Sequence, residues 1–164
     1  RDVNCAKVTT ATDQMLGGSG PMQALPVVGD IGSGPRRDEG NVQVMLEALG
    51  VQSGEMNILT EEDASVAGVV KQVRQFPGGA KAFLWLEFDD ANAHFLNVAK
   101  VDGTVVVIDN QGRRTAEDIA RQLDGAKQIW VIRTRNLPMR MQGTLREWID
   151  TKPAHALVVG GSAG

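Results

Sequence analysis

Cysteine and histidine are scarce in this chain of 164 residues, which contains one cysteine and two histidines. A single cysteine excludes an internal disulfide, and with only His94 and His155 beside it a structural zinc site is not expected. No apolar run reaches the length that spans a bilayer, and the N-terminus has no signal-peptide pattern. The sequence therefore implies neither a metal nor a cofactor, and no membrane insertion.

The chain also has little excess of charge of either sign, with a net charge of −3 and an isoelectric point near 5.4. This argues against nucleic acid as a partner, and we interpret Arg36-Arg37 and Arg113-Arg114 as solvated surface. With 42% hydrophobic residues, residues 1–164 are long enough for a single domain with a real core. Because the chain starts at Arg1 rather than at methionine, we expect it to be a piece excised from a longer protein.

The lone cysteine lies near the start of a predicted helix. Asp2 or Asn4 can cap this helix, and Gly17-Gly18 can end it. Five residues have the spacing of one helical face: Cys5, Val8, Thr12, Met15 and Leu16. Free backbone N–H groups and the positive dipole end of a first turn favour a thiolate. The alternative is that Cys5 is simply a small buried apolar residue.

The rest of the chain contains both helix-like and strand-like patterns, and we expect the α+β class. Glycine and proline are frequent over residues 17–40, where we expect a long loop that could form the rim of a site. Thr60 and Asp63 have the spacing of a helix-capping box, and Thr115 and Asp118 can cap a second helix. We expect helices over residues 42–49, 60–73, 115–123 and 144–149, strands over residues 81–88 and 128–134, and a short apolar run in the tail after residue 156.

Residues 93–111 have the pattern of a β-hairpin, with Asp102-Gly103 as the two-residue turn. If Val101 pairs with Thr104, Leu96 lies opposite Asp109. Alternation then places seven side chains on one face: His94, Leu96, Val98, Val105, Val107, Asp109 and Gln111. His94 and Asp109 are diagonal neighbours, roughly 7–8 Å apart at Cα, close enough for a carboxylate to reach an imidazole. A bulge at the turn would instead separate them.

A helix-start cysteine, a histidine and an aspartate on adjacent strands form the arrangement of papain-type enzymes. Cys5 would be the nucleophile, His94 the acid and base, and Asp109 the residue that orients the imidazole. Taken singly, His94 could be a satisfied core histidine and Asp109 a turn residue. Because both lie on one predicted face and a helix-start cysteine is available, a catalytic role is favoured over a structural one.

Three short blocks carry a family resemblance: Asn4-Cys5 at the helix start, the run from His94 to Val98, and the run from Val107 to Gly112. They resemble papain-fold toxin domains of the glutamine deamidase type, which are C-terminal modules of bacterial polymorphic toxins. The resemblance implies a papain-like cysteine hydrolase fold, in which an N-terminal helix carrying the nucleophile packs against an antiparallel sheet.

By the same resemblance Cys5, His94 and Asp109 form the catalytic triad, and Gln111 is a supporting polar residue. The oxyanion would be stabilised by the Cys5 backbone N–H and by a second donor, for which Asn4 or Gln111 is available. Two positions depart from the family pattern. Val8 stands where many members have a second cysteine, and Ala93 stands where they have glycine before the histidine.

The implied reaction is hydrolysis of a glutamine side-chain amide through a thioester. The resemblance further implies a toxin secreted or delivered by its bacterium, acting on a protein in the cytosol of the target cell in interbacterial competition. A cognate immunity protein would be the second partner. A cysteine peptidase or a transglutaminase could use the same triad, and a non-catalytic interaction domain with a buried Cys5 remains the alternative of another class.

Overall fold

The computed structural model describes residues 12–13, 16, 56–90, 92–109, 114–134 and 136–160. Thr12, Asp13 and Leu16 fall within the first predicted helix, and all three are helical and buried. The remaining elements follow in chain order: β1 (Met56–Thr60), η3 (Glu61–Asp63), α3 (Val66–Arg74), β2 (Lys81–Glu87), β3 (Ala93–Val101), β4 (Thr104–Ile108), α4 (Ala116–Gly125), β5 (Gln128–Arg133), α5 (Met139–Asp150) and β6 (Ala156–Val159).

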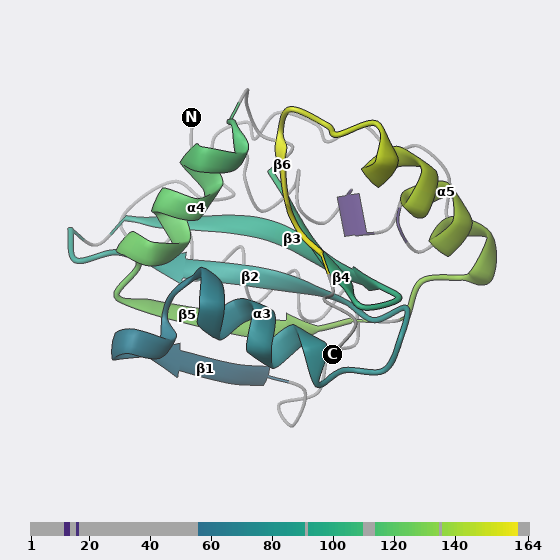
Figure 1. Ribbon diagram of the computed structural model, residues 1–164. Coiled ribbons are helices and arrows are strands. Elements are labelled where there is room, and N and C mark those ends of the chain that lie inside the picture. Colours follow the sequence, from purple (N-terminus) through teal and green to yellow (C-terminus); the bar gives the residue numbers. More distant parts are fainter. Residues whose placement is uncertain are drawn as a thin grey trace, which may run out of the picture.

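The strands form a six-stranded sheet in the order β1-β5-β2-β3-β4-β6, and every neighbouring pair is antiparallel. Strands β2, β3 and β4 follow one another along the chain, whereas β5 inserts between β1 and β2 (Figure 1). The first and last strands thus form the two edges. None of the described helices is both long and apolar enough to cross a membrane.

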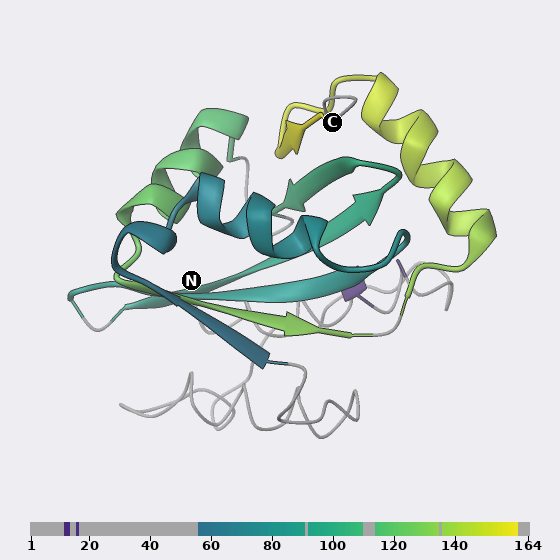
Figure 2. The ribbon, with the colours of Figure 1, turned by 60° about the horizontal axis from the view of Figure 1, so that its bottom comes forward.

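Helices α3 and α4 cover one face of the sheet (Figures 1 and 2). Alternate strand residues such as Leu84, Leu96 and Val107 point to this face, because successive side chains of a strand point to opposite sides. Val69 and Val73 from α3, and Ile119 and Leu123 from α4, complete the larger apolar core.

A second core lies against the opposite face of β3 and β4. Leu145 of α5 and Leu137 just before it pack there with alternate strand residues, including Val101 and Val106. Leu16 of the N-terminal helix belongs to the same cluster. Both faces of the β3–β4 hairpin are therefore buried, which explains why its strands consist almost entirely of apolar residues.

The predicted register of the hairpin is confirmed. Val101 pairs with Thr104, and Asn97 pairs with Ile108. Asp102 takes the left-handed conformation that such a turn requires, with φ of 55°. Its carboxylate accepts hydrogen bonds from Arg146 Nε at 2.9 Å and Nη2 at 3.3 Å. The turn is thereby tied to α5.

Helix α4 begins with the predicted capping pair. The Thr115 side chain accepts a hydrogen bond from the Asp118 N–H, and the Asp118 carboxylate accepts one from the Thr115 N–H, both at 3.1 Å. The capping box expected at Thr60 was wrong, because Thr60 ends β1 and its side chain makes no capping bond. Instead, Ser65 accepts a hydrogen bond from the Gly68 N–H and begins α3 five residues later.

Two strands were missed by the sequence analysis. β1 and β6 are short, and each pairs with a strand distant in sequence, β5 and β4 respectively. Helix α5 is also longer than the predicted 144–149, starting at Met139 after Pro138. The predicted helix over 42–49 and the glycine-rich loop over 17–40 lie outside the described residues.

A buried ionic cluster joins the N-terminal helix to the sheet. Asp13 Oδ1 lies 2.8 Å from Lys81 Nζ on β2 and accepts a hydrogen bond of 2.6 Å from Thr134 Oγ1. Lys81 Nζ also donates to Thr134 Oγ1 at 2.9 Å. The Lys81 and Asp13 side chains are only 3% and 2% exposed. Their mutual pairing offsets the cost of removing both charges from water.

We expect Lys81→Met alone to lower the free energy of unfolding by about 3–5 kcal/mol, because Asp13 would remain as an uncompensated buried charge. The double change Asp13→Leu with Lys81→Met should recover most of this loss. Urea unfolding followed by circular dichroism measures both, with the exposed Lys127→Met as the matched control. If the single and double variants lost the same stability, this account of the cluster would be wrong.

The capping box of α4 should respond to pH. The hydrogen bond from the Thr115 backbone, with that from its side chain, lowers the pKa of Asp118 below its ordinary value. Stability contributed by this ionised carboxylate is therefore present above the ordinary carboxyl pKa and is lost as pH falls through the lowered one.

We expect Thr115→Ala to cost about 1 kcal/mol at neutral pH, because α4 loses its cap. The loss should shrink at acidic pH, where Asp118 becomes protonated and the wild-type box weakens. Thermal unfolding of both proteins between pH 2 and 7 tests this, with Thr144→Ala as the control on an exposed helix position. An equal cost at every pH would contradict it.

Candidate active site

The two predicted strand residues of the site meet at one end of the β3–β4 hairpin. His94 is the second residue of β3, and Asp109 directly follows β4. The confirmed register places both side chains on the face that carries Leu96 and Val107. Along the rest of this face every second residue is apolar and buried. At its end His94 and Asp109 occupy the corresponding positions.

His94 and Asp109 form a buried hydrogen-bonded pair. Nε2 of His94 lies 3.0 Å from Oδ2 of Asp109, and the two side chains are 7% and 1% exposed. An ionised carboxylate can only accept hydrogen bonds, so Nε2 carries the hydrogen of this contact. The second ring nitrogen, Nδ1, makes no hydrogen bond within the described ranges. Nδ1 is thus the ring atom open to a proton-transfer partner.

Arg114 is a third member of this cluster that the sequence analysis missed. Its Nε lies 3.5 Å from the same Oδ2 of Asp109, and its side chain is only 30% exposed. The interpretation of Arg113-Arg114 as solvated surface is therefore wrong for Arg114. No periodic pattern relates Arg114 to Asp109 in the sequence, because their contact depends on how the chain runs from β4 to α4. The guanidinium thus contacts the same carboxylate oxygen as the imidazole and offsets part of its charge.

Cys5, Asn4 and Gln111, the other predicted site residues, lie outside the described residues. The helical residues nearest to Cys5 in sequence are Thr12 and Asp13, and Asp13 makes the buried contact with Lys81. His155, the other histidine, is exposed and lies beside Trp148, with ring centroids 6.2 Å apart. It has no part in the His94 cluster.

A comparison with known protein families identifies the family of this chain. The family model described as papain fold toxin 1, glutamine deamidase, matches residues 3–114, which is more than half of the chain. This chain belongs to that family. The papain-fold toxin is accordingly a cysteine enzyme by fold. The matched range includes Cys5, His94 and Asp109, and it ends at Arg114.

Two further comparisons, with solved structures and with curated proteins, do not specify the function any further. A search of solved structures matches the crystal structure of the Pseudomonas avirulence protein AvrPphB, with 16% sequence identity and a TM-score of 0.38. The match covers 96% of this chain and 92% of that chain. No curated protein matches the papain-fold toxin. Its mixed helical and antiparallel architecture agrees with the papain fold that the family description states.

If Cys5 pairs with His94, its thiol should react as a thiolate at acidic pH. We expect alkylation by iodoacetamide at about pH 6 to be fast in the parent protein and to fall more than about tenfold in His94→Ala. Asp109→Ala should give an intermediate rate, because the imidazole would lose the group that orients it. Mass spectrometry of the alkylated protein between pH 5 and 9 measures this.

The matched control is His155→Ala, which removes the other histidine and should leave the rate unchanged. A slow reaction that neither His94→Ala nor Asp109→Ala alters would indicate a structural cysteine and would remove the thiolate from the site.

Proposed function

We propose that this papain-fold toxin hydrolyses the side-chain amide of a glutamine in a target protein. The observation that carries the proposal is the buried hydrogen bond between His94 and Asp109 in a chain of the glutamine deamidase family. In this proposal Cys5 is the nucleophile, His94 is the general acid and base, and Asp109 orients the imidazole. Asn4 or Gln111 is the second donor to the oxyanion, beside the Cys5 N–H.

The first half of the reaction transfers the acyl group to sulfur. The Cys5 thiolate attacks the amide carbon, and the tetrahedral intermediate collapses as the C–N bond breaks. His94 gives the proton on Nδ1 to the departing nitrogen, so ammonia leaves and a thioester remains. Asp109 stays ionised and accepts the hydrogen bond from Nε2–H throughout, which stabilises the imidazolium before the transfer.

The second half returns the enzyme to its starting state. His94, now neutral, takes a proton from water at Nδ1, and the oxygen attacks the thioester carbon. The C–S bond breaks, the thiolate is restored beside the imidazolium, and glutamate remains in the target. Arg114 contributes by holding the Asp109 carboxylate, and therefore the Nε2 tautomer, through both halves.

Two partners and a location belong to the same proposal. The toxin is delivered by the producing bacterium and acts in the cytosol of the target cell on a protein with a reactive glutamine. The producer protects itself with a cognate immunity protein that binds the toxin. No nucleic acid takes part, in keeping with the net charge of −3.

The test is incubation of the toxin with a glutamine-containing protein extract from a susceptible cell. We expect ammonia release and a mass gain of about 1 Da at a target glutamine, both abolished by Cys5→Ala and reduced at least about a hundredfold by His94→Ala. His155→Ala is the control. Cleaved main chain would instead identify a peptidase, incorporation of a labelled primary amine a transglutaminase, and an unchanged extract a non-catalytic domain.

A further inference from the structure

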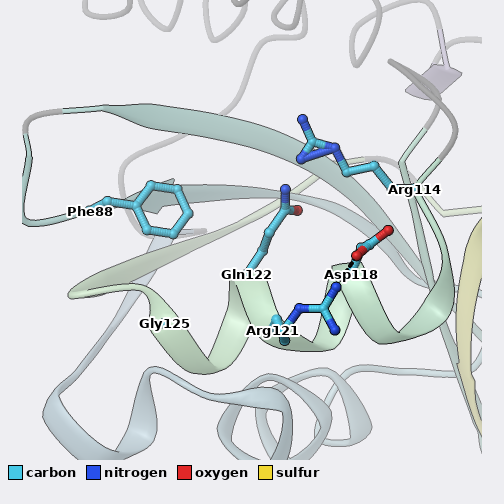
Figure 3. Close-up of a pocket in the computed structure, with 6 residues that line it drawn as sticks. All are labelled: Phe88, Arg114, Asp118, Arg121, Gln122 and Gly125. Carbon is cyan, nitrogen blue, oxygen red and sulfur yellow. Dashed lines mark hydrogen bonds and ion pairs between the residues drawn. The ribbon is translucent and has the colours of Figure 1, made fainter.

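Two adjoining cavities lie along α4 beside the His94 ring. The smaller, of about 250 Å³, is lined by His94, Ala93, Asp90 and Asn92 together with Phe88, Arg114 and Gln122. The larger, of about 530 Å³, shares those last three residues and continues past Asp118 and Arg121 to Gly125 (Figure 3). Because they share one wall, the cavities form a single trough that leads from His94 along the helix.

Gln122 lies at the middle of this trough, and its carboxamide is unsatisfied. Oε1 is enclosed by the protein and has no hydrogen-bond partner. The amide makes no other hydrogen bond within the residues that the structure describes. Leaving such a group unpaired is unfavourable, and most native proteins avoid it. Since the terminal torsion of glutamine is soft, a small rotation turns Oε1 into the cavity that Gln122 lines.

The charged groups around the trough are largely paired. Arg121 contacts Asp118, and Arg114 contacts Asp109. In Figure 3 the side chains of Phe88, Gln122 and Arg114 all lie on the same side of α4, with Gln122 between the other two. Arg114 uses Nε for Asp109, so its two terminal nitrogens can donate to another acceptor. An unsatisfied amide beside spare N–H donors suits a ligand that offers both a hydrogen-bond donor and an acceptor.

We propose that this trough binds the main chain of the target polypeptide next to the reactive glutamine. A carboxamide oxygen accepts hydrogen bonds, so Oε1 of Gln122 can accept one from a peptide N–H, and the spare guanidinium N–H groups of Arg114 can donate to a peptide carbonyl. The peptide N–H that follows the glutamine donates to Oε1 of Gln122, and its carbonyl accepts from Arg114. Free glutamine lacks this following peptide N–H, so it cannot donate the same hydrogen bond to Oε1 of Gln122.

This inference rests on the proposed function, because it places the glutamine amide at His94. It extends that function by assigning the main chain beside the glutamine to the trough, and by naming Gln122 as a specificity-determining residue. The contact lies beside the reacting atoms, so Gln122 should affect binding more than the chemical step.

The experiment measures binding without turnover, in the Cys5→Ala protein. The probe is a doubly blocked glutaminyl-glycine dipeptide, titrated by NMR, and a second probe carries an N-methyl group on the amide that follows glutamine. We expect Gln122→Leu to weaken binding of the first probe roughly tenfold, and N-methylation to weaken binding by a similar factor. Combined, the two changes should cost no more than either alone, because they remove the same hydrogen bond.

Gln75→Leu on the exposed end of α3 is the matched control and should bind the first probe like the parent. Gln122→Leu should fold with unchanged or higher thermal stability, because it removes a buried unsatisfied amide. Equal binding by Gln122→Leu and the parent, no saturable binding of the blocked dipeptide, or tighter binding of free glutamine would each overturn the inference.

Ammonia release from the blocked dipeptide by the protein with Cys5 intact separates this inference from the proposed function. If binding depends on Gln122 but no ammonia is released, the proposed deamidase activity is wrong. The proposed binding of the main chain in the trough is then still supported. Release with the same KM in Gln122→Leu and the parent would refute the trough and leave the deamidase standing.

Discussion

The register of the β3–β4 hairpin is the constraint on which the site depends. A two-residue turn, with Asp102 in the left-handed conformation, pairs Val101 with Thr104. A shift by one residue would move every side chain of one strand to the opposite face. His94 and Asp109 would then lie on different sides of the sheet, and the residues that the shifted strand contributes to each core would change faces. The contact of Arg146 with Asp102 holds this turn against α5.

Two buried polar pairs lie at separate places on the sheet. The Asp13–Lys81 pair fixes the rotation of the N-terminal helix on the sheet, because a buried carboxylate has few acceptable partners. The His94–Asp109 pair lies at one end of the hairpin, and Arg114 extends it toward α4. Arg114 therefore belongs both to the proposed catalytic group and to the trough, so that substrate binding and imidazole orientation share one side chain.

Local patterns could be predicted from the sequence, and contacts between distant segments could not. The Asp102-Gly103 turn and the Thr115–Asp118 capping box depend only on neighbouring residues, and both were identified. β1 and β6 were missed because their short runs become strands only by pairing with β5 and β4. Arg114 and Gln122 carried no motif, since their positions depend on how α4 packs over the sheet. The structure does not describe Cys5, so its place beside His94 stays a prediction.

The order of the strands also determines when this sheet can be completed during synthesis of the chain. β1 is the first described strand, yet its neighbour β5 is made about seventy residues later, after the three strands of the central meander. The last strand, β6, then completes the other edge. A chain that emerges progressively from its N-terminus can form the β2–β3–β4 meander early, but both outer edges wait for the C-terminal third. Until then β1 lacks its described neighbour in the sheet, so its backbone groups on that side stay unpaired until β5 is made.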